Sequence, residues 1–311
     1  MPREPITRRT ALAGGLTLAS GRASAALGSP REPTAAERLG PGASFGFAAL
    51  DMARGHVTSV NPDARFPMCS SFKWLLAACV LSRVDRGEER LDRMVGFGPA
   101  DLLEYAPATK AVLAKAGGTR AMISVAELCA AAVELSDNTA ADFLLAFVGG
   151  PQRLTAWLRA HGDGVTRLDR IEPEMNRSAV GDPRDTTTPA VMLRDLRTIL
   201  YGSVLQPASR RVLMGWMLGC RTGAERLAGG LPPGWRIAHK TGTATYDQPE
   251  PHGYRNAEGD VGVLLRPGGA PILVAAYVAG FTCPTAEADP WFAAVAHALT
   301  ADALSLRAPH G

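Results

Sequence analysis

The sequence predicts a protein of the α/β (α+β) class, with a five-stranded antiparallel sheet flanked by helices and an inserted all-helical lobe. Strand-like runs lie near both ends of the chain, whereas helical spacing of apolar residues dominates from about 70 to 215. Because strand backbones need hydrogen-bonding partners, the simplest solution pairs both sets of strands in one sheet. We therefore expect a discontinuous α/β lobe, residues 33–62 and 215–306, around a helical lobe, residues 63–214, with a ligand-binding cleft between them.

The individual elements are predicted from apolar runs that turn residues interrupt. An N-terminal hairpin turns around Asp51–Gly55, and RPGGAP separates the last two strand-like runs. The five expected strands cover residues 43–50, 56–60, 235–242, 260–267 and 271–280. Apolar residues spaced three and four apart predict helices over 124–135, 140–148 and 152–160. A final helix, about 289–304, closes the chain.

The overall composition is that of a soluble globular protein and excludes several function classes. The 311 residues are 46% hydrophobic and 20% charged, and the net charge is only +3. The charges are scattered, and no basic run carries interleaved aromatic residues, so we expect no nucleic-acid partner. The cysteine and histidine spacings fit no zinc template, and we expect neither a metal nor another cofactor.

The N-terminus has the pattern of an export signal. Arg8 and Arg9 precede a weakly apolar run, residues 11–19, and then Ala23-Ser24-Ala25, which suggests the twin-arginine route and cleavage near residue 25. The alternative is a tail without a signal function. The run is too short to cross a bilayer core of about 30 Å. We expect residues 1–25 to be removed, and the mature protein to be periplasmic or secreted, monomeric and without a membrane span.

Ser70 and Lys73 raise the first question about chemistry. Within FPMCSSFKWLLAACV, residues 66–80, Lys73 interrupts an apolar run that predicts a buried helix. Residues three apart share one helix face, and a desolvated lysine has a lowered pKa, so it could accept the proton of the serine hydroxyl. The pattern S-x-x-K is equally compatible with a capping serine and a lysine whose ammonium group reaches solvent.

Two further motifs are also ambiguous when each is taken alone. Ser136-Asp137-Asn138 lies between two predicted helices, where such residues commonly cap the next helix. In a catalytic site, Ser136 would instead relay a proton and Asn138 would hold a substrate amide. Lys240-Thr241-Gly242-Thr243 ends a predicted strand, whose edge could bind a substrate as an added strand. There the lysine would supply positive charge and the glycine would permit close approach.

Taken in order, S-x-x-K, S-D-N and K-T-G form the set shared by class A β-lactamases and penicillin-binding proteins. The chain resembles class A serine β-lactamases over nearly its whole length after residue 25, and the resemblance implies the β-lactamase and transpeptidase-like fold. The segments that carry it are FPMCSSFK, SDNTAADFLL, GGPQRLTAWLR, VTRLDRIEPEMN, PRDTT and LPPGWRIAHKTGT.

The resemblance implies a role for each motif residue. Ser70 is the nucleophile that a β-lactam acylates, and the backbone N–H groups of Ser70 and Thr243 form the oxyanion hole. Lys73, Ser136 and Lys240 move protons and hold the substrate carboxylate. The other implied substrate-binding positions are Asn138, Asn176, Thr241, Gly242, Thr243, the aromatic Tyr105 of the cleft wall, and Arg226, for which Arg255 is a rival candidate.

Glu172 separates a β-lactamase from a protein that only traps the β-lactam. Penicillin-binding proteins share the three motifs but stall as acyl-enzymes. In IEPEMN, Glu172 and Asn176 are four residues apart, so one helical turn can aim both at one deacylating water. The family carries the peptide bond after this glutamate in cis. It also pairs Arg170 with Asp185 across a compact Ω-loop, here residues 170–185, through an arginine–carboxylate fork.

The chain departs from the family pattern in two places. The connection after K-T-G, residues 243–260, is longer than usual and lies beside the substrate edge, so it should affect which β-lactam side chains fit. The resemblance also places Cys129 and Cys69 where relatives form disulfides, but the partner positions hold Ala77 and Ala244. We therefore expect neither bridge, and the odd number of cysteines leaves at least one thiol unpaired; the others are Cys79, Cys220 and Cys283.

The predicted function is that of an exported class A β-lactamase. It would hydrolyse the β-lactam ring of penicillins and cephalosporins by acylation of Ser70 and deacylation with Glu172, and so confer resistance. Two alternatives remain open: a DD-peptidase or penicillin-binding protein, and a covalent β-lactam sensor that acylates without turnover. Glu172, Asn176 and the lack of a predicted membrane anchor argue against the first alternative, and the sensor would need a membrane coupling that the sequence does not predict.

Overall fold

A computed structural model describes residues 38–40, 42–177, 181–245 and 256–304 of the chain. The predicted export signal, Arg255 and most of the connection after K-T-G lie outside the described residues. The described residues belong to one compact unit of mixed α/β class, which confirms the predicted class. The finer division into lobes at residues 62 and 214 stays a prediction.

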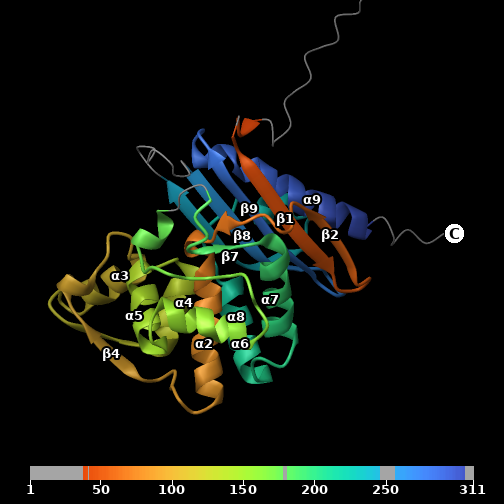
Figure 1. The fold of residues 1–311 in the computed structure, drawn as a ribbon. Helices are drawn as coiled ribbons and strands as arrows, with labels where there is room; N and C mark the ends of the chain where they lie inside the picture. The colour runs from red at the N-terminus through yellow and green to blue at the C-terminus, as the bar shows by residue number, and fades with distance from the viewer. Residues whose placement is uncertain (1–37, 41, 178–180, 246–255, 305–311) are drawn as a thin grey trace, which may run out of the picture. The chain divides into compact units, whose positions relative to one another are not determined.

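A five-stranded antiparallel sheet in the order β2-β1-β9-β8-β7 forms one part of this unit (Figure 1). The N-terminal and C-terminal strands meet where β1 pairs with β9, from Ser44 opposite Ala279 to Asp51 opposite Ile272. The predicted pairing of distant strands is therefore confirmed. The strands are β1 (Ser44–Asp51), β2 (His56–Val60), β7 (Arg236–Thr245), β8 (Asn256–Leu265) and β9 (Ile272–Phe281).

The pair of β7 and β8 is longer than the sequence predicted. β8 begins at Asn256 instead of residue 260, and β7 continues to Thr245. The charges and glycine of NAEGD favoured a loop in the sequence, yet Glu258 and Asp260 are almost fully buried within the strand. Arg226 pairs with Glu258 and His239 with Asp260, and such partners offset the cost of burying carboxylates.

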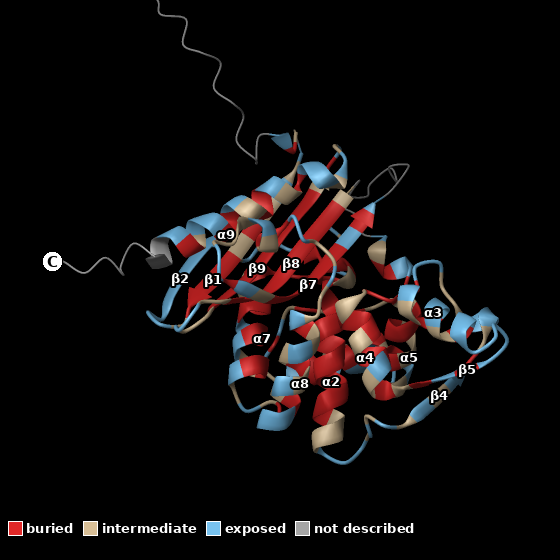
Figure 2. Ribbon diagram, turned by 180° about the vertical axis from the view of Figure 1, so that it is seen from behind, coloured by how far each residue is buried: buried red, intermediate tan, exposed pale blue. Residues whose placement is uncertain are grey.

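Helices cover both faces of the sheet. On one face, α9 (Asp289–Leu304) joins Trp291 and Phe292 to Val274 and Val278 of the sheet in one apolar cluster (Figure 2). On the other face, α7 (Pro189–Tyr201) contacts β1 and β9. No helix in the described ranges is long and apolar enough to cross a membrane.

The helical part of the unit is arranged around α2 (Lys73–Asp85), which is buried from its first residue to Ser82. The predicted helices are present within two residues of their expected starts, as α4 (Val125–Glu134), α5 (Asn138–Val148) and α6 (Pro151–Ala160). The other helices of this part are α3 (Pro107–Lys115) and α8 (Pro207–Leu218).

Two short strand pairs were missed by the sequence. They are β3 (Phe66–Pro67) with β6 (Thr186–Thr187), and β4 (Met94–Phe97) with β5 (Ala121–Ser124). β3 and β6 have only two residues each, too few for a measurable periodicity, so only the tertiary structure shows that pair. The first pair matters for the site, because Met68 N donates to Asp185 O at 3.0 Å and so ties the chain before Ser70 to the end of the 170–185 loop.

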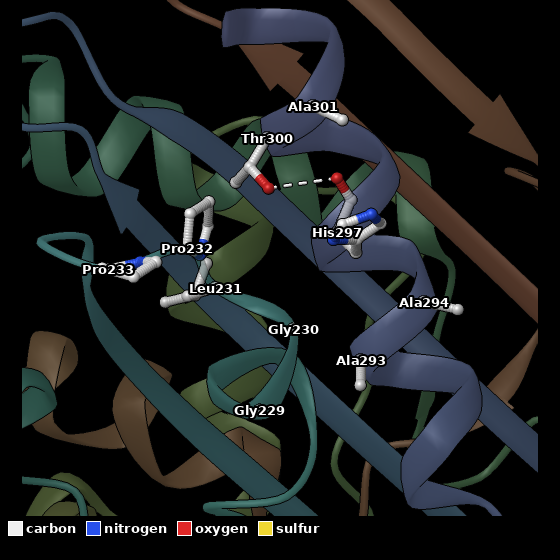
Figure 3. A pocket seen from close by; sticks show the side chains of 10 residues that line it. All are labelled: Gly229, Gly230, Leu231, Pro232, Pro233, Ala293, Ala294, His297, Thr300 and Ala301. Carbon is white, nitrogen blue, oxygen red and sulfur yellow. Dashed lines mark hydrogen bonds between the residues drawn. The ribbon is translucent and has the colours of Figure 1, made fainter.

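A hollow of about 610 Å³ lies beside α9, away from the three motifs (Figure 3). There the turn η4 (Leu227–Gly230) meets the helix so closely that a Cβ on Gly230 would lie 1.9 Å from Ala293 O. None of the predicted site residues lines this hollow. Its lining residues are Gly229, Gly230, Leu231, Pro232, Pro233, Ala293, Ala294, His297, Thr300 and Ala301.

Candidate active site

Ser70 lies in a tight 3₁₀ turn, η1 (Cys69–Phe72), which continues directly into α2. The capping alternative does not describe it, because the residues at the N-caps of η1 and α2 are Met68 and Phe72. Lys73 is fully buried and does not reach solvent. Its Nζ donates a hydrogen bond to Ser70 Oγ at 2.9 Å, so the predicted serine–lysine contact is formed.

The ammonium group of Lys73 joins three motifs at one point. Besides Ser70 Oγ, its neighbours are Ser136 O at 2.9 Å, Asn138 Oδ1 at 2.5 Å and Glu172 Oε1 at 3.0 Å. A buried cation needs such compensation, because desolvation without hydrogen bonds and a counter-charge is costly. S-x-x-K, S-D-N and IEPEMN, which are far apart in sequence, therefore form one cluster.

The S-D-N motif contains both a helix cap and a contact of the catalytic cluster, which the sequence left open as alternatives. Asp137 is structural, since its carboxylate caps α5 by accepting from Ala140 N at 2.9 Å and also accepts from Thr109 N at 2.9 Å. Ser136 has a left-handed backbone, φ +59°, and its side chain faces the K-T-G strand instead. Ser136 Oγ accepts from Lys240 Nζ at 3.1 Å.

Lys240 is fully buried at the sheet edge that β7 forms. Its Nζ donates to Thr241 O at 2.8 Å in addition to Ser136 Oγ. Burial lowers the pKa of Lys240 to about 7, and the positive charges of Lys73 and Arg226 act in the same direction, whereas Cys220 and Asp260 oppose them. Lys240 can therefore change between its ammonium and amine forms near neutral pH.

Gly242 has a role that the sequence did not predict. A Cβ at this position would lie 2.5 Å from Met68 O and 2.9 Å from Ser71 N, so the missing side chain lets η1 pack against β7. This contact brings the turn that contains Ser70 against the strand that contains Thr243. Thr241, whose side chain is buried, is held by a hydrogen bond between its Oγ1 and the hydroxyl of Thr222.

Glu172 is 1% exposed, and its two carboxylate oxygen atoms have separate partners. Oε1 accepts from Ser70 Oγ at 3.5 Å and from Lys73, whereas Oε2 accepts from Asn176 Nδ2 at 2.7 Å. The spacing of four between Glu172 and Asn176 therefore brings the two side chains together, through the turn η3 (Glu174–Asn176). The bond from Glu172 to Pro173 is cis, as the resemblance implied.

Asp142 is a site residue that sequence reasoning missed. Its Oδ1 accepts from Glu172 N at 3.1 Å and so holds the loop against α5. Burial raises the pKa of this carboxyl to about 7, partly offset by the hydrogen bond from the Glu172 backbone. The signal was present in SDNTAAD, because Asp142 follows Asn138 by four residues and shares its helix face.

The 170–185 loop is anchored by Asp185, which is fully buried. The predicted pair is formed, with Arg170 Nε donating to Asp185 Oδ2 at 2.6 Å. The expected two-nitrogen fork is wrong, because Arg170 Nη1 donates to Arg177 O at 2.6 Å instead. Backbone amides replace the second nitrogen, since Asp185 Oδ1 accepts from Asp169 N at 2.7 Å and from Arg170 N at 3.1 Å.

Arg226 and Tyr105 lie at the margin of the cluster. Arg226 is buried, and its guanidinium nitrogens bond Asp289 Oδ1 at 3.1 Å, Gly242 O at 2.9 Å and Thr243 Oγ1 at 2.7 Å. Of these partners, Thr243 is the exposed one, so Arg226 contacts the surface of the site through Thr243. Tyr105 is 52% exposed, and its carbonyl oxygen accepts from Asn138 N at 3.0 Å.

The five cysteines are all free thiols in this structure. Cys69 and Cys129 are fully buried. No group of three or more potential metal ligands occurs among the residues that the structure describes.

Comparisons with known proteins address the family of the chain. Residues 34–303 match the model of the beta-lactamase enzyme family. Beta-lactamase L2 of Stenotrophomonas maltophilia is 44% identical over 269 residues, which cover 86% of this chain and 84% of that protein.

Solved structures give the same result. An ancestral class A beta-lactamase (GNCA) is 47% identical with a TM-score of 0.77, over 86% of this chain and 97% of that one. A beta lactamase from Xanthomonas campestris pv. campestris is 44% identical with a TM-score of 0.77, over 85% of this chain and 94% of that one. Together with the clustered motifs, these matches show that the chain belongs to the class A serine β-lactamase family and is a β-lactam hydrolase.

Proposed function

We propose that the protein hydrolyses penicillins and cephalosporins through an acyl-enzyme on Ser70, and that Glu172 activates the water that releases it. One observation carries this proposal above all. Glu172 Oε1 lies 3.5 Å from Ser70 Oγ, so a carboxylate base is in reach of the atom that bears the acyl group. A protein that only traps β-lactams has no use for a buried base at this point.

Acylation follows from the contacts of Ser70 and Lys73. Ser70 Oγ attacks the β-lactam carbonyl carbon and passes its proton to one of its two basic neighbours, Lys73 Nζ at 2.9 Å or Glu172 Oε1 at 3.5 Å. The carbonyl oxygen becomes an oxyanion between the N–H groups of Ser70 and Thr243. The ring nitrogen leaves with a proton from Ser136 Oγ, which Lys240 Nζ replaces across 3.1 Å.

Deacylation uses the other side of Glu172. The side-chain Nδ2 of Asn176 donates a hydrogen bond to Glu172 Oε2. The other amide atom, Oδ1, is buried without a hydrogen-bond partner among the described residues. Before this step, the proton taken from Ser70 passes by way of Lys73 Nζ to Lys240, which had lost one to the ring nitrogen through Ser136, so that Glu172 is again a carboxylate. The Asn176 oxygen can then accept one proton of a water while Glu172 removes the other, and the hydroxide formed attacks the ester carbon. Ser70 Oγ is the leaving group and regains a proton from Glu172 Oε1, 3.5 Å away.

Substrate binding is assigned to groups with unused donors. Asn138 Oδ1 is held by Lys73, which leaves its Nδ2 to donate to the amide carbonyl of the substrate side chain. Lys240 and the exposed Thr243 hydroxyl take the substrate carboxylate, which supports an anionic substrate.

The test mixes purified mature protein with a chromogenic cephalosporin. We expect many turnovers per enzyme molecule, and Glu172→Ala should accumulate an acyl-enzyme visible by mass spectrometry. Release of one equivalent without turnover by the wild type would favour the penicillin-binding or sensor alternatives. Fast deacylation in the variant would refute the role of Glu172.

We also propose that the protein is exported as a monomer, with Arg8 and Arg9 directing the twin-arginine route. Replacing both arginines by lysine should leave the unprocessed chain in the cytoplasm, which cell fractionation measures. Sedimentation at equilibrium tests the monomer.

A further inference from the structure

Arg226 has no N–H group left for a substrate, although the resemblance implied that it binds one. A guanidinium group carries five N–H donors. Nε donates to one protein oxygen, and Nη1 and Nη2 donate to two each, so all five are taken up within the protein. The accepting atoms are Asp289 Oδ1, Gly242 O, Gly259 O, Thr243 Oγ1 and Glu258 Oε1. In this arrangement the guanidinium group cannot bind a substrate carboxylate directly.

Two of these partners are carboxylates, and both are bound to the same cation. Glu258 of β8 is paired with Arg226 Nη2, and its side chain is fully buried. Asp289, at the start of α9, accepts from Arg226 Nε at 3.1 Å, and its side chain is 22% exposed. With both carboxylates ionised, the group of three side chains carries one net negative charge. The positive charge of Arg226 is therefore cancelled within the protein before it can act on an anionic ligand.

Glu258 lies next to a residue that we assign to the substrate carboxylate. The register of β7 and β8 places Glu258 directly opposite Thr243. Arg226 Nη2 bonds both side chains, with Thr243 Oγ1 at 2.7 Å and Glu258 Oε1 as its two acceptors. Thr243 is exposed, and its hydroxyl is one of the groups proposed above to hold the substrate carboxylate. The charge of Glu258 is therefore linked to a bound carboxylate through Arg226 and Thr243.

The hydrogen bond to Arg226 does not by itself require an acid in this place. Glu258 Oε1 makes that contact, whereas Oε2 is buried without a hydrogen-bond partner among the described residues. A glutamine, which has one acceptor oxygen, could make the same bond. Burial raises the pKa of Glu258 to about 7 against the opposing charge of Arg226, and Asp289 and Asp260 add to the rise. The negative charge is thus the property of Glu258 that its contact with Arg226 does not explain.

We propose that Glu258 determines specificity for the charge of the substrate, because its carboxylate cancels the charge of Arg226 and so weakens the binding of an anionic β-lactam at Thr243. This inference rests on the proposed function, since it concerns the carboxylate of the β-lactam. Glu258 touches neither the substrate nor the reacting atoms and acts through Arg226 and Thr243. With a neutral residue in its place, Asp289 alone would balance Arg226, and the electrostatic potential at Thr243 would become more positive.

The test compares Glu258→Gln with the wild type on a chromogenic cephalosporin. The measurement is made above the pKa of Glu258, which is about 7, so that the wild-type side chain is ionised. Glutamine keeps an acceptor oxygen for Arg226 and removes the charge. We expect KM to fall by about tenfold, the effect of one charge across roughly 10 Å at an effective dielectric constant of about 20, with kcat within about twofold of wild type. An unchanged or higher KM overturns the proposal.

A neutral substrate separates the effect of the charge from a change in the shape of the site. The methyl ester of the same cephalosporin lacks the carboxylate, so Glu258→Gln should leave its KM within about twofold of wild type. An equal fall of KM for the acid and the ester would contradict the proposal. The matched control is Asp92→Asn, which removes the same charge from a side chain that is 70% exposed and paired with Arg90. That variant should keep the wild-type KM for both substrates, because solvent and salt screen an exposed charge.

The outcomes distinguish this inference from the proposed function. If the wild type releases one equivalent without turnover, the proposed hydrolysis fails. The dependence of acylation on β-lactam concentration, followed by mass spectrometry, then still compares acid and ester in both proteins. Should Glu258→Gln not fold, Asp289→Asn removes the second negative charge beside Arg226. Because the Asp289 side chain is 22% exposed, we expect a smaller fall of KM, about two- to threefold, for the acid alone. The same change of KM for acid and ester in that variant would overturn the inference.

Discussion

Replacing Gly242 by alanine should separate the Ser70 turn from the K-T-G strand and so damage the oxyanion hole. The added Cβ would lie 2.5 Å from Met68 O, about 0.9 Å short of the 3.4 Å at which ordinary contact begins. Backbone atoms are on both sides, so no flexible side chain can yield. We expect overpacking to cost about 1–3 kcal/mol of stability, and a shift of nearly 1 Å to lower kcat by about 100-fold.

The assay for Gly242→Ala combines cephalosporin turnover with urea denaturation. Gly215→Ala is the matched control, because Gly215 lies in α8 with no atom within 4 Å of the added Cβ. That variant should keep its kcat and gain about 0.5–1 kcal/mol, as expected for alanine in a helix interior. Wild-type kcat in Gly242→Ala would refute the reasoning, since η1 and β7 would then not depend on their close approach. A loss of stability with unchanged kcat would refute only the link to the oxyanion hole.

Three other substitutions test the role of Glu172 and of the residues that hold its loop in place. Glu172→Ala should lower the deacylation rate by about 10²–10⁴-fold, the usual contribution of a general base, while Lys73 stays against Ser70 and acylation continues; burst kinetics measure both steps. Asp142→Asn keeps the acceptor for Glu172 N but removes an acid whose pKa is raised from 3.8 to about 7. The stability that this raised pKa contributes is complete below pH 3.8 and is lost as the pH rises through about 7, so the Tm of the variant should gain on wild type across that window and then level off. A constant Tm difference would contradict this. Asp185→Asn leaves Arg170, itself 20% exposed, without its counter-charge, and should cost stability at the lower end of roughly 3–5 kcal/mol by urea denaturation; a loss well under 1 kcal/mol would show that the backbone amides alone hold the loop.

The catalytic residues could be predicted because each belongs to a short local motif. S-x-x-K, S-D-N, K-T-G and IEPEMN name Ser70, Lys73, Ser136, Lys240 and Glu172, and the structure brings all five side chains together. The helices α4, α5 and α6 also follow from local spacing, since the apolar period of a helix lies within a dozen residues.

The errors arose where distant groups decide the outcome. Glu258 and Asp260 read as loop residues, because a carboxylate in a buried strand is costly unless a partner neutralises it. Their partners, Arg226 and His239, lie elsewhere in the sequence, and no local pattern connects them. The fork of Arg170 failed for the same reason, since backbone amides took the place of its second nitrogen.

The sequence by itself determined the class of fold, the family resemblance and the chemical identity of the reacting groups. These depend on residue type and spacing along the chain, which the sequence contains directly. Only the tertiary structure decided how those groups are held, with Gly242 as the contact between η1 and β7 and Asp142 behind Glu172. Such contacts join segments that are far apart in sequence, and their energies depend on burial and on distances of a few ångströms, which exist only once the chain is folded.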